Sequence, residues 1–123
     1  MAPTRETIKG PVRDQVAANV RARRERLRLS LADVAALLTQ LGHPMGRHAV
    51  LRIETGARAA SVDDLVALAL ALDCSPLALL LPSEDPGEPV KITSRAALEY
   101  ADAWHWARGK GTSRPKILTE RKG

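Results

Sequence analysis

The chain has 123 residues, of which 45% are hydrophobic and 27% charged, and its formal net charge is +5. This length supports one compact domain with extensions and excludes two large domains. The single cysteine, Cys74, excludes an internal disulfide, and the strongest apolar run, Leu65–Leu72, is too short to cross a bilayer. Because there is also no secretory signal, we expect a cytoplasmic protein.

The first predicted elements are a flexible basic arm over residues 1–11 and a helix over residues 12–28. The apolar stripe of this helix consists of Val12, Val16, Val20 and Leu27. Arg24 falls on the same stripe, where an unpaired buried charge would cost roughly several kcal/mol. Glu54 is the natural carboxylate partner, so we favour a structural ion pair for Arg24 over the alternative of a phosphate contact.

Two short helical patterns joined by a turn follow between residues 30 and 56. Ser30 stands three residues before Asp33, the spacing of a capping box, and Gly42 and Pro44 stop the first pattern. The apolar positions of this first pattern are Val34, Leu37, Leu38 and Leu41. The spacing predicts an amphipathic helix followed by a turn.

The second pattern, around residues 46–54, has two different faces. Its apolar face consists of Ala49, Val50 and Ile53, and its opposite face of Arg47, His48, Leu51 and Arg52. In a major groove, arginine can fork onto guanine O6 and N7, histidine can exchange a hydrogen bond with a base, and leucine can pack on a thymine methyl. We therefore predict a helix-turn-helix that touches DNA; the alternative is a solvated helix face.

Two further helices are predicted after this motif. The first begins at Ser61, and its apolar positions are Val62, Leu65, Val66, Leu68, Leu70 and Leu72, so we expect it to be the central packed helix. Ser75 and Pro76 start a short second helix through Leu81, which has more leucines than one face can bury. The leucines that we expect to contact a partner subunit are Leu77, Leu80 and Leu81.

Many positions between residues 12 and 81 share one ordered pattern. They are Arg24, Leu29, Ser30, Val34, Ala35, Leu38, Val50, Arg52, Ile53, Glu54, Gly56, Ser61, Leu65, Leu68, Ala69, Leu72, Ser75 and Pro76. This set resembles the Xre family, the Cro and lambda-repressor type of helix-turn-helix protein. The resemblance implies a five-helix, all-α domain that binds double-stranded DNA, with an arginine-glutamate pair clamping its first helix to the recognition helix. The base contacts that it implies are Gly46, Arg47, His48, Leu51 and Arg52.

Three features depart from the family pattern. Leu31 replaces the glutamine that usually touches the DNA backbone, and the turn Thr39–Met45 is several residues longer than usual. Gly46 begins the recognition helix without a side-chain acceptor, although its backbone N–H can meet a phosphate. Further phosphate contacts are expected from Arg21, Arg28, Ser30 and Arg58, with Arg21 and Arg28 seven residues apart on one helix face.

The C-terminal third has a different composition. Residues 82–92 are predicted to be an acidic, proline-rich linker with a short strand at Val90–Ile92. A helix over Arg95–Arg108 is expected within residues 93–109, and the basic tail 110–123 is expected to be disordered.

The aromatic side chains of this C-terminal helix indicate an interaction surface. Tyr100 and Trp104 share one side, whereas Trp106 points the opposite way because two helical residues are about 200° apart. We expect Tyr100, Trp104 and Trp106 to contact a second copy or a partner protein. The alternative is an intramolecular lid.

Charge supports a nucleic-acid partner for the motif. Residues 1–60 carry 11 basic and five acidic side chains, whereas residues 61–94 carry one basic and six acidic ones. A basic half is the electrostatic footprint of nucleic-acid binding, although frequent arginine alone also gives this balance. The frequent arginine, alanine and proline suggest a GC-rich bacterial or phage genome.

These features predict a sequence-specific transcriptional regulator on the nucleoid. We expect a repressor that binds a palindromic operator as a homodimer, with activation equally compatible with the sequence. The alternative is an antitoxin or other interaction module whose tryptophan helix binds a partner protein. We expect no enzyme activity, metal or cofactor, because the sequence has no catalytic constellation or phosphate loop, and His43, His48 and His105 have no zinc-like spacing.

Overall fold

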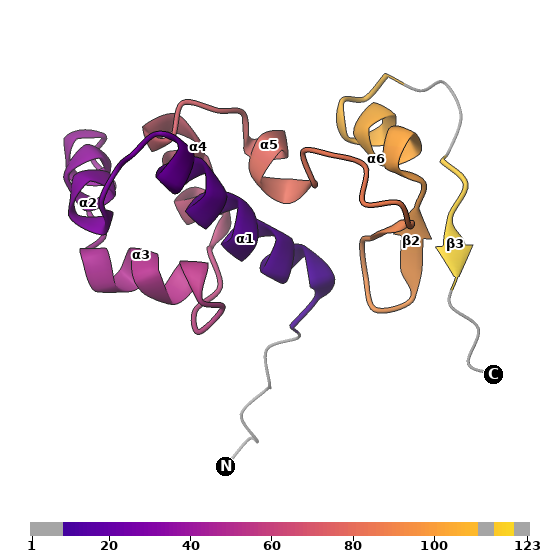
Figure 1. Cartoon of the computed structure of the whole chain (residues 1–123), viewed down its shortest axis with the longest axis horizontal. Helices are drawn as coiled ribbons and strands as arrows, with labels where there is room; N and C mark the ends of the chain where they lie inside the picture. The colour runs from indigo at the N-terminus through magenta and orange to yellow at the C-terminus, as the bar shows by residue number, and fades with distance from the viewer. Residues whose placement is uncertain (1–8, 111–114, 120–123) are drawn as a thin grey trace, which may run out of the picture.

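The computed structural model describes residues 9–110 and 115–119, which form two neighbouring units (Figure 1). The larger unit consists of α1 (Pro11–Arg26), α2 (Leu31–Gln40), α3 (Arg47–Glu54), α4 (Val62–Ala71) and α5 (Pro76–Leu80). The smaller, C-terminal unit consists of β1 (Val90–Lys91), β2 (Ala96–Leu98), α6 (Tyr100–Ala107) and β3 (Leu118–Thr119). The helical domain is thus as predicted in outline, while the sheet corrects the expectation of an all-α chain.

The core of the larger unit receives side chains from all of its helices. The core side chains larger than alanine with at most 1% exposure are Val20, Val34, Leu38, Val50, Leu68, Leu72 and Leu79. Burial of an aliphatic side chain of this kind contributes roughly 1.5–3 kcal/mol. Because such short helices are marginal in isolation, this shared packing rather than helix propensity stabilises them.

Serine caps set where three of the helices begin. The Ser30 hydroxyl accepts a hydrogen bond from the Asp33 backbone N–H at 2.9 Å, and the Asp33 carboxylate accepts one from the Ser30 N–H at 2.8 Å. The predicted capping box is therefore confirmed. Ser61 and Asp64 form the same reciprocal pair before α4, and the Ser75 hydroxyl caps α5. Each cap satisfies amides that the first turn of a helix leaves unpaired.

Two details of the predicted helix packing are wrong. Helix α4 is not buried all round, because its side chains Val62, Val66 and Leu70 are 78%, 44% and 66% exposed. Leu27 is 38% exposed because α1 ends at Arg26 and the chain turns away there. Apolar residues thus occur on faces that no other described element covers.

The C-terminal unit differs most from its prediction. Strand β2 pairs antiparallel with β1 on one side and with β3 on the other, with Val90 opposite Leu98 and Ala97 opposite Leu118. The helix expected from Arg95 therefore begins only at Tyr100. The pairing of Leu118–Thr119 corrects the expectation of a tail without structure, whereas residues 1–8, 111–114 and 120–123 of the arm and tail lie outside the described residues. Strand pairing overrides the helix propensity of the alanines in β2.

The two units are joined by hydrogen bonds and by a shared apolar contact. The Asn19 side chain of α1 donates to the backbone oxygens of Leu79 and Leu81, at 3.0 and 2.9 Å. Leu81 is 3% exposed and packs with the C-terminal unit, while Leu80 contacts the cores of both units. The chain between α5 and β1 is therefore anchored at its two ends, where Leu81 and Val90 are buried, while residues 83–89 between them are exposed.

Two of the aromatic residues predicted to meet a partner also contact their own chain. Trp104 Nε1 donates to the Pro82 backbone oxygen at 3.1 Å, and the Tyr100 hydroxyl donates to the Ser83 backbone oxygen at 2.9 Å. The Arg108 guanidinium lies 5.0 Å from the centre of the Trp104 ring. Tyr100 and Trp104 thus hold the chain before β1 against α6, and Leu81 is 3% exposed; a partner role for these three residues stays a prediction. Trp106 remains 50% exposed.

Candidate nucleic-acid interface

Helix α3 has the two faces that the sequence predicted. Val50 and Ile53 are 0% and 2% exposed and face the core. The opposite face is exposed and consists of Arg47, His48, Leu51 and Arg52. In Figure 1, α3 lies along the lower edge of the larger unit with α1 above it. The residues predicted to contact bases therefore lie together on one open side of the molecule.

Gly46 begins α3 as the sequence indicated. It is the N-cap residue in an extended conformation, and no side chain caps the helix. Its carbonyl accepts hydrogen bonds from the N–H groups of Ala49 and Val50, at 3.0 and 3.2 Å. The first N–H groups of α3 have no partner within the helix, which is the arrangement that accepts an anion at a helix N-terminus.

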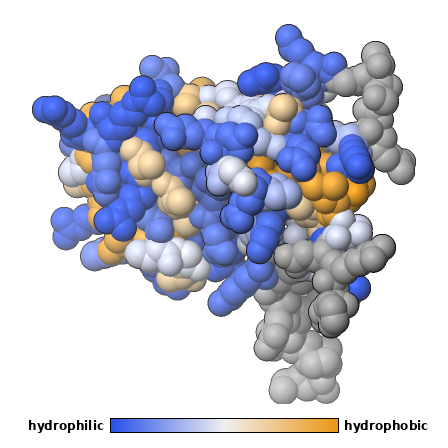
Figure 2. All heavy atoms as spheres, turned by 45° about the vertical axis from the view of Figure 1, so that its right-hand side comes forward, coloured by the Kyte–Doolittle hydropathy of each residue, from blue (hydrophilic) through white to orange (hydrophobic). Residues whose placement is uncertain are grey.

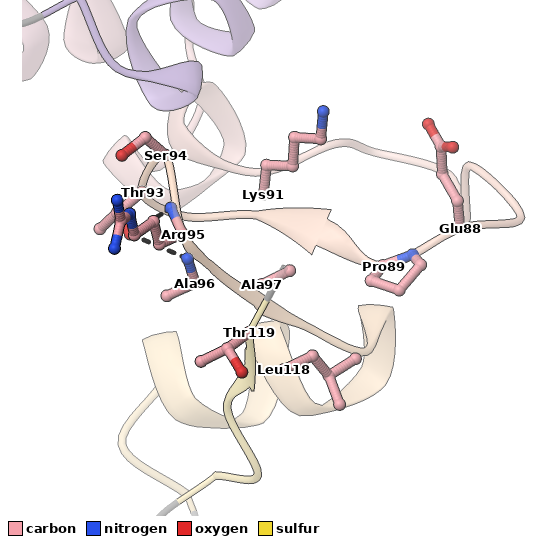
Figure 3. A pocket seen from close by; sticks show the side chains of 10 residues that line it. All are labelled: Glu88, Pro89, Lys91, Thr93, Ser94, Arg95, Ala96, Ala97, Leu118 and Thr119. Carbon is pink, nitrogen blue, oxygen red and sulfur yellow. Dashed lines mark hydrogen bonds between the residues drawn. The ribbon is translucent and has the colours of Figure 1, made fainter. Parts of the chain in front are cut away.

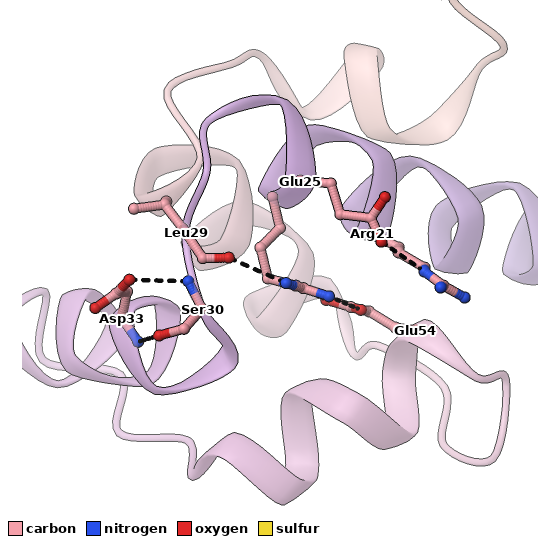
Figure 4. A network of polar contacts seen from close by, with 7 residues as sticks. Arg21, Glu25, Leu29, Ser30, Asp33 and Glu54 are labelled. Atoms are coloured by element: carbon pink, nitrogen blue, oxygen red, sulfur yellow. Dashed lines mark hydrogen bonds and ion pairs between the residues drawn. The ribbon is translucent and has the colours of Figure 1, made fainter.

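An ion pair holds α3 against α1 (Figure 4). Arg24 Nε and Nη2 donate to the two carboxylate oxygens of Glu54 at 2.7 and 2.9 Å, and Arg24 Nη1 donates to the Leu29 backbone oxygen at 3.0 Å. The two side chains are 15% and 2% exposed. The hydrogen bond with Glu54 raises the pKa of Arg24 above its usual value. The predicted ion pair is present, and its two parallel bonds fix the end of α3.

The long turn before α3 is closed by its own contacts. The His43 N–H donates to the Leu38 backbone oxygen at 3.0 Å, and Gly42 adopts a left-handed conformation with φ +80°. Met45 is 7% exposed and belongs to the core. Leu31, at the position where the family has a glutamine, is half-buried against the same core. The turn between α2 and α3 therefore contributes an apolar side chain, that of Met45, to the core.

The residues expected to touch phosphates differ in the contacts that they make within the protein. Arg21 pairs with Glu25 at 2.9 Å on the exposed surface of α1, and Arg58 Nη2 lies 3.3 Å from the Asp64 carboxylate. Ser30 is exposed and caps α2. Arg28 lies beyond the end of α1 with φ +57°, so it does not share a helix face with Arg21 as predicted.

Sequence reasoning missed three contacts next to α3. Arg13 Nη2 donates to the Gly56 backbone oxygen at 2.8 Å, and no local spacing marks that pairing. Asp64 binds both His43 and Arg58, at 2.7 and 3.3 Å. Its position three residues after Ser61 indicates a cap but not these two partners, because they depend on how the chain returns to α4.

The C-terminal unit carries a pocket of its own, away from α3 (Figure 3). The pocket has a volume of about 350 Å³, and its lining includes Lys91, Thr93, Arg95 and Leu118. Figure 2 brings this unit forward and shows hydrophobic side chains gathered toward its right-hand edge on an otherwise mostly hydrophilic face. Across the described ranges, no three His, Cys, Asp or Glu residues are grouped to hold a metal ion. In the same ranges, no helix is long and apolar enough to span a membrane.

Two comparisons with known proteins found a match. A family model described as a helix-turn-helix domain matches residues 15–80. A solved structure, that of the hypothetical transcription factor NHTF from Neisseria, is similar with a TM-score of 0.52 and 20% sequence identity. That similarity covers 66% of this chain and 90% of the other, and it shows a shared fold. No curated protein matches the sequence.

Proposed function

Because this chain belongs to the helix-turn-helix domain family, we propose that it is a sequence-specific regulator of transcription that reads the major groove of double-stranded DNA with α3. One observation carries the proposal. The exposed face of α3 presents two arginines and a histidine, while the opposite face is locked to the core and to α1. A rigid helix with such a face is suited to base readout.

Each exposed residue has a specific part in the proposed readout. Arg47 and Arg52 donate to guanine O6 and N7, His48 exchanges a hydrogen bond with a base, and Leu51 packs on a thymine methyl. The N–H of Gly46 approaches the DNA at the start of the helix, where the helix dipole favours a negative charge.

Phosphate contacts outside α3 position the domain on the duplex. We assign them to exposed groups around the motif, namely Arg21, Arg28, Ser30 and Arg58. Arg21 already pairs with a carboxylate in the free protein, so binding would exchange that contact for phosphate, whereas Arg58 keeps Asp64 on Nη2 and offers its other guanidinium N–H groups to phosphate. Such contacts attract any DNA sequence.

As the biological output we propose repression, exerted by a homodimer at a palindromic operator in the cytoplasm, on the nucleoid. Two-fold symmetry lets two copies of α3 meet half-sites one helical turn apart. A protein of this size that occupies an operator blocks the DNA beneath it without needing a second activity. Dimerisation requires an apolar surface, and α4 exposes one through Val62, Val66 and Leu70.

The first experiment is selection of binding sites from a random DNA pool, followed by affinity measurements at a stated salt concentration. We expect a palindromic motif, and we expect Arg47→Ala and Arg52→Ala to weaken binding to it by roughly 5- to 150-fold. Arg26→Ala is the matched control, because Arg26 is exposed on α1 outside the reading face. A pool without an enriched motif, or equal losses in all three variants, would contradict the proposal.

Exposed Trp106 favours a second candidate function, that of an antitoxin or other protein-interaction module. Half of this large side chain is open to solvent in a chain with only three aromatic residues. Aromatic residues are enriched where proteins bind one another. A one-to-one complex with a second protein that dissociates on Trp106→Ala would support this candidate, and normal DNA selection by the same variant would leave the first function intact.

A further inference from the structure

Two charged side chains are buried in the described part of the chain, those of Glu54 and Asp64. Glu54 is the last residue of α3 and binds Arg24, as the sequence predicted. Asp64 lies in the first turn of α4, and its side chain is 6% exposed. Nothing in the DNA-reading face described above uses Asp64.

Asp64 connects three different segments. Its Oδ1 lies 2.7 Å from His43 Nε2, in the turn that precedes α3. Its Oδ2 accepts from Arg58 Nη2 at 3.3 Å, in the segment that follows α3, and from the Ser61 N–H at 3.0 Å. One carboxylate therefore binds the chain on both sides of the recognition helix.

The anchor of this carboxylate is itself rigid. Helix α4 is fixed in the core by Leu68, which is 0% exposed, and its first turn is capped by Ser61. Burial raises the pKa of Asp64, but hydrogen bonds from the Ser61 backbone and from His43, together with the charge of Arg58, lower it by more, so the net pKa is below its usual value. The three donors thus compensate a buried charge, and losing one of them weakens that compensation.

We propose that Asp64 is a positioning residue for DNA reading, a clasp that sets the orientation of α3 by holding His43 before it and Arg58 after it. The proposal rests on the proposed function and adds to it a residue that touches no DNA. Bidentate contacts with base edges need accurate placement of Arg47 and Arg52, whereas attraction to phosphates tolerates displacement. Loosening the clasp should therefore reduce specific binding more than nonspecific binding.

The proposed clasp can be separated from a purely structural role of Asp64 as the cap of α4. The capping box requires only Ser61 and Asp64, because each accepts a hydrogen bond from the other's N–H. Removing the His43 donor leaves that box intact. Variants of His43 therefore separate the clasp from the cap, whereas Arg58 variants would also remove a proposed phosphate contact.

The test compares His43→Ala and His43→Gln with the wild-type protein, with His105→Ala as the control because His105 is exposed on α6. We expect His43→Ala to weaken binding to the selected site by about 10-fold while binding to random duplex changes less than about 2-fold. His43→Gln supplies a side-chain N–H donor and should restore most of the loss. Circular dichroism melting establishes that each variant is folded.

Parallel loss of specific and nonspecific binding, or no loss in folded His43→Ala, would overturn the proposal. Hydrogen exchange of the α3 amides in the protein without DNA provides a second readout. We expect exchange about 10-fold faster in His43→Ala than in the wild type or His43→Gln, with α1 unchanged. If the wild type selects no DNA motif, the proposed function fails, and the exchange rates alone decide whether the clasp exists; unchanged rates refute it.

Discussion

The orientation of α3 relative to α1 depends on a bidentate contact between two residues, Arg24 and Glu54. Both side chains are largely withdrawn from water, at 15% and 2% exposure. Removing one partner of such a pair leaves a buried charge without compensation, which costs far more than the pair itself contributes. The neighbouring pair Arg21–Glu25 has the same chemistry on the open surface, with side chains 65% and 55% exposed.

At this scale we expect Arg24→Ala to lower the free energy of unfolding by about 3 kcal/mol. The matched change Arg21→Ala should lower it by less than about 0.5 kcal/mol, because water and ions screen an exposed pair. Urea denaturation followed by tryptophan fluorescence measures both values. If the two variants lose similar free energies of unfolding, burial does not make the Arg24–Glu54 pair more important to stability than the Arg21–Glu25 pair.

Among the elements, α4 has one side in the core and an apolar side that is exposed. One side packs Ala67 and Leu68 into the core, and the other exposes Val62, Val66 and Leu70 at intervals of one helical turn. Such a row is the seam by which helices pair. Because the residues follow one line, a two-fold axis near Val66 lets the row pack against the same row of a second copy.

We therefore expect Leu70→Gln to shift a dimer toward monomer in sedimentation velocity experiments, with its helical circular dichroism spectrum unchanged. Glutamine keeps the helix propensity and adds no charge, so the expected change comes from lost apolar contact. Trp106→Ala is the comparison, because the sequence predicted the C-terminal helix as the oligomer surface. If Trp106→Ala dissociates the dimer and Leu70→Gln does not, the dimer interface lies on α6.

For the molecule as a whole, the main feature is the contact between the two units. Leu81 packs against Val90, Leu98 and Ala103, while Leu80 reaches both cores. Asn19 ties the end of α5 to α1 by hydrogen bonds to backbone oxygens. Packing of Leu80 and Leu81 therefore holds the C-terminal unit against the helix-turn-helix unit, and the Asn19 hydrogen bonds fix the end of α5 that carries these leucines.

The corresponding prediction is that Leu81→Ala lowers the free energy of unfolding by about 3 kcal/mol, the usual cost of a cavity at a buried leucine. Leu77→Ala is expected to cost less, because Leu77 is only half-buried. The dimerisation constant of folded Leu81→Ala should equal that of the wild type. A changed constant with unchanged stability would show that Leu81 faces a second copy after all.

Local spacing was sufficient to predict much of the helix-turn-helix unit and part of its candidate site. The Ser30 cap, the turn at Gly42 and the two faces of α3 depend on residues within a few positions of one another, so the sequence predicts them directly. The Arg24–Glu54 pair spans 30 positions, yet a charge on an apolar stripe and the family resemblance were enough to indicate it.

Only the tertiary structure decided the remaining features. Ala96 and Ala97 favour helix locally, but Leu118–Thr119 returns to pair with them as a strand. Which side of α4 stays open, and that Asp64 meets both His43 and Arg58, depend on how helices distant in sequence pack. The sequence by itself thus determined the helices of the larger unit, their caps and the two faces of α3, because these arise from short-range periodicity and hydrogen bonding. The tertiary structure determined strand pairing, the open apolar row on α4 and the contacts of Asp64, because each needs contacts between segments that are far apart in the chain and leave no local pattern.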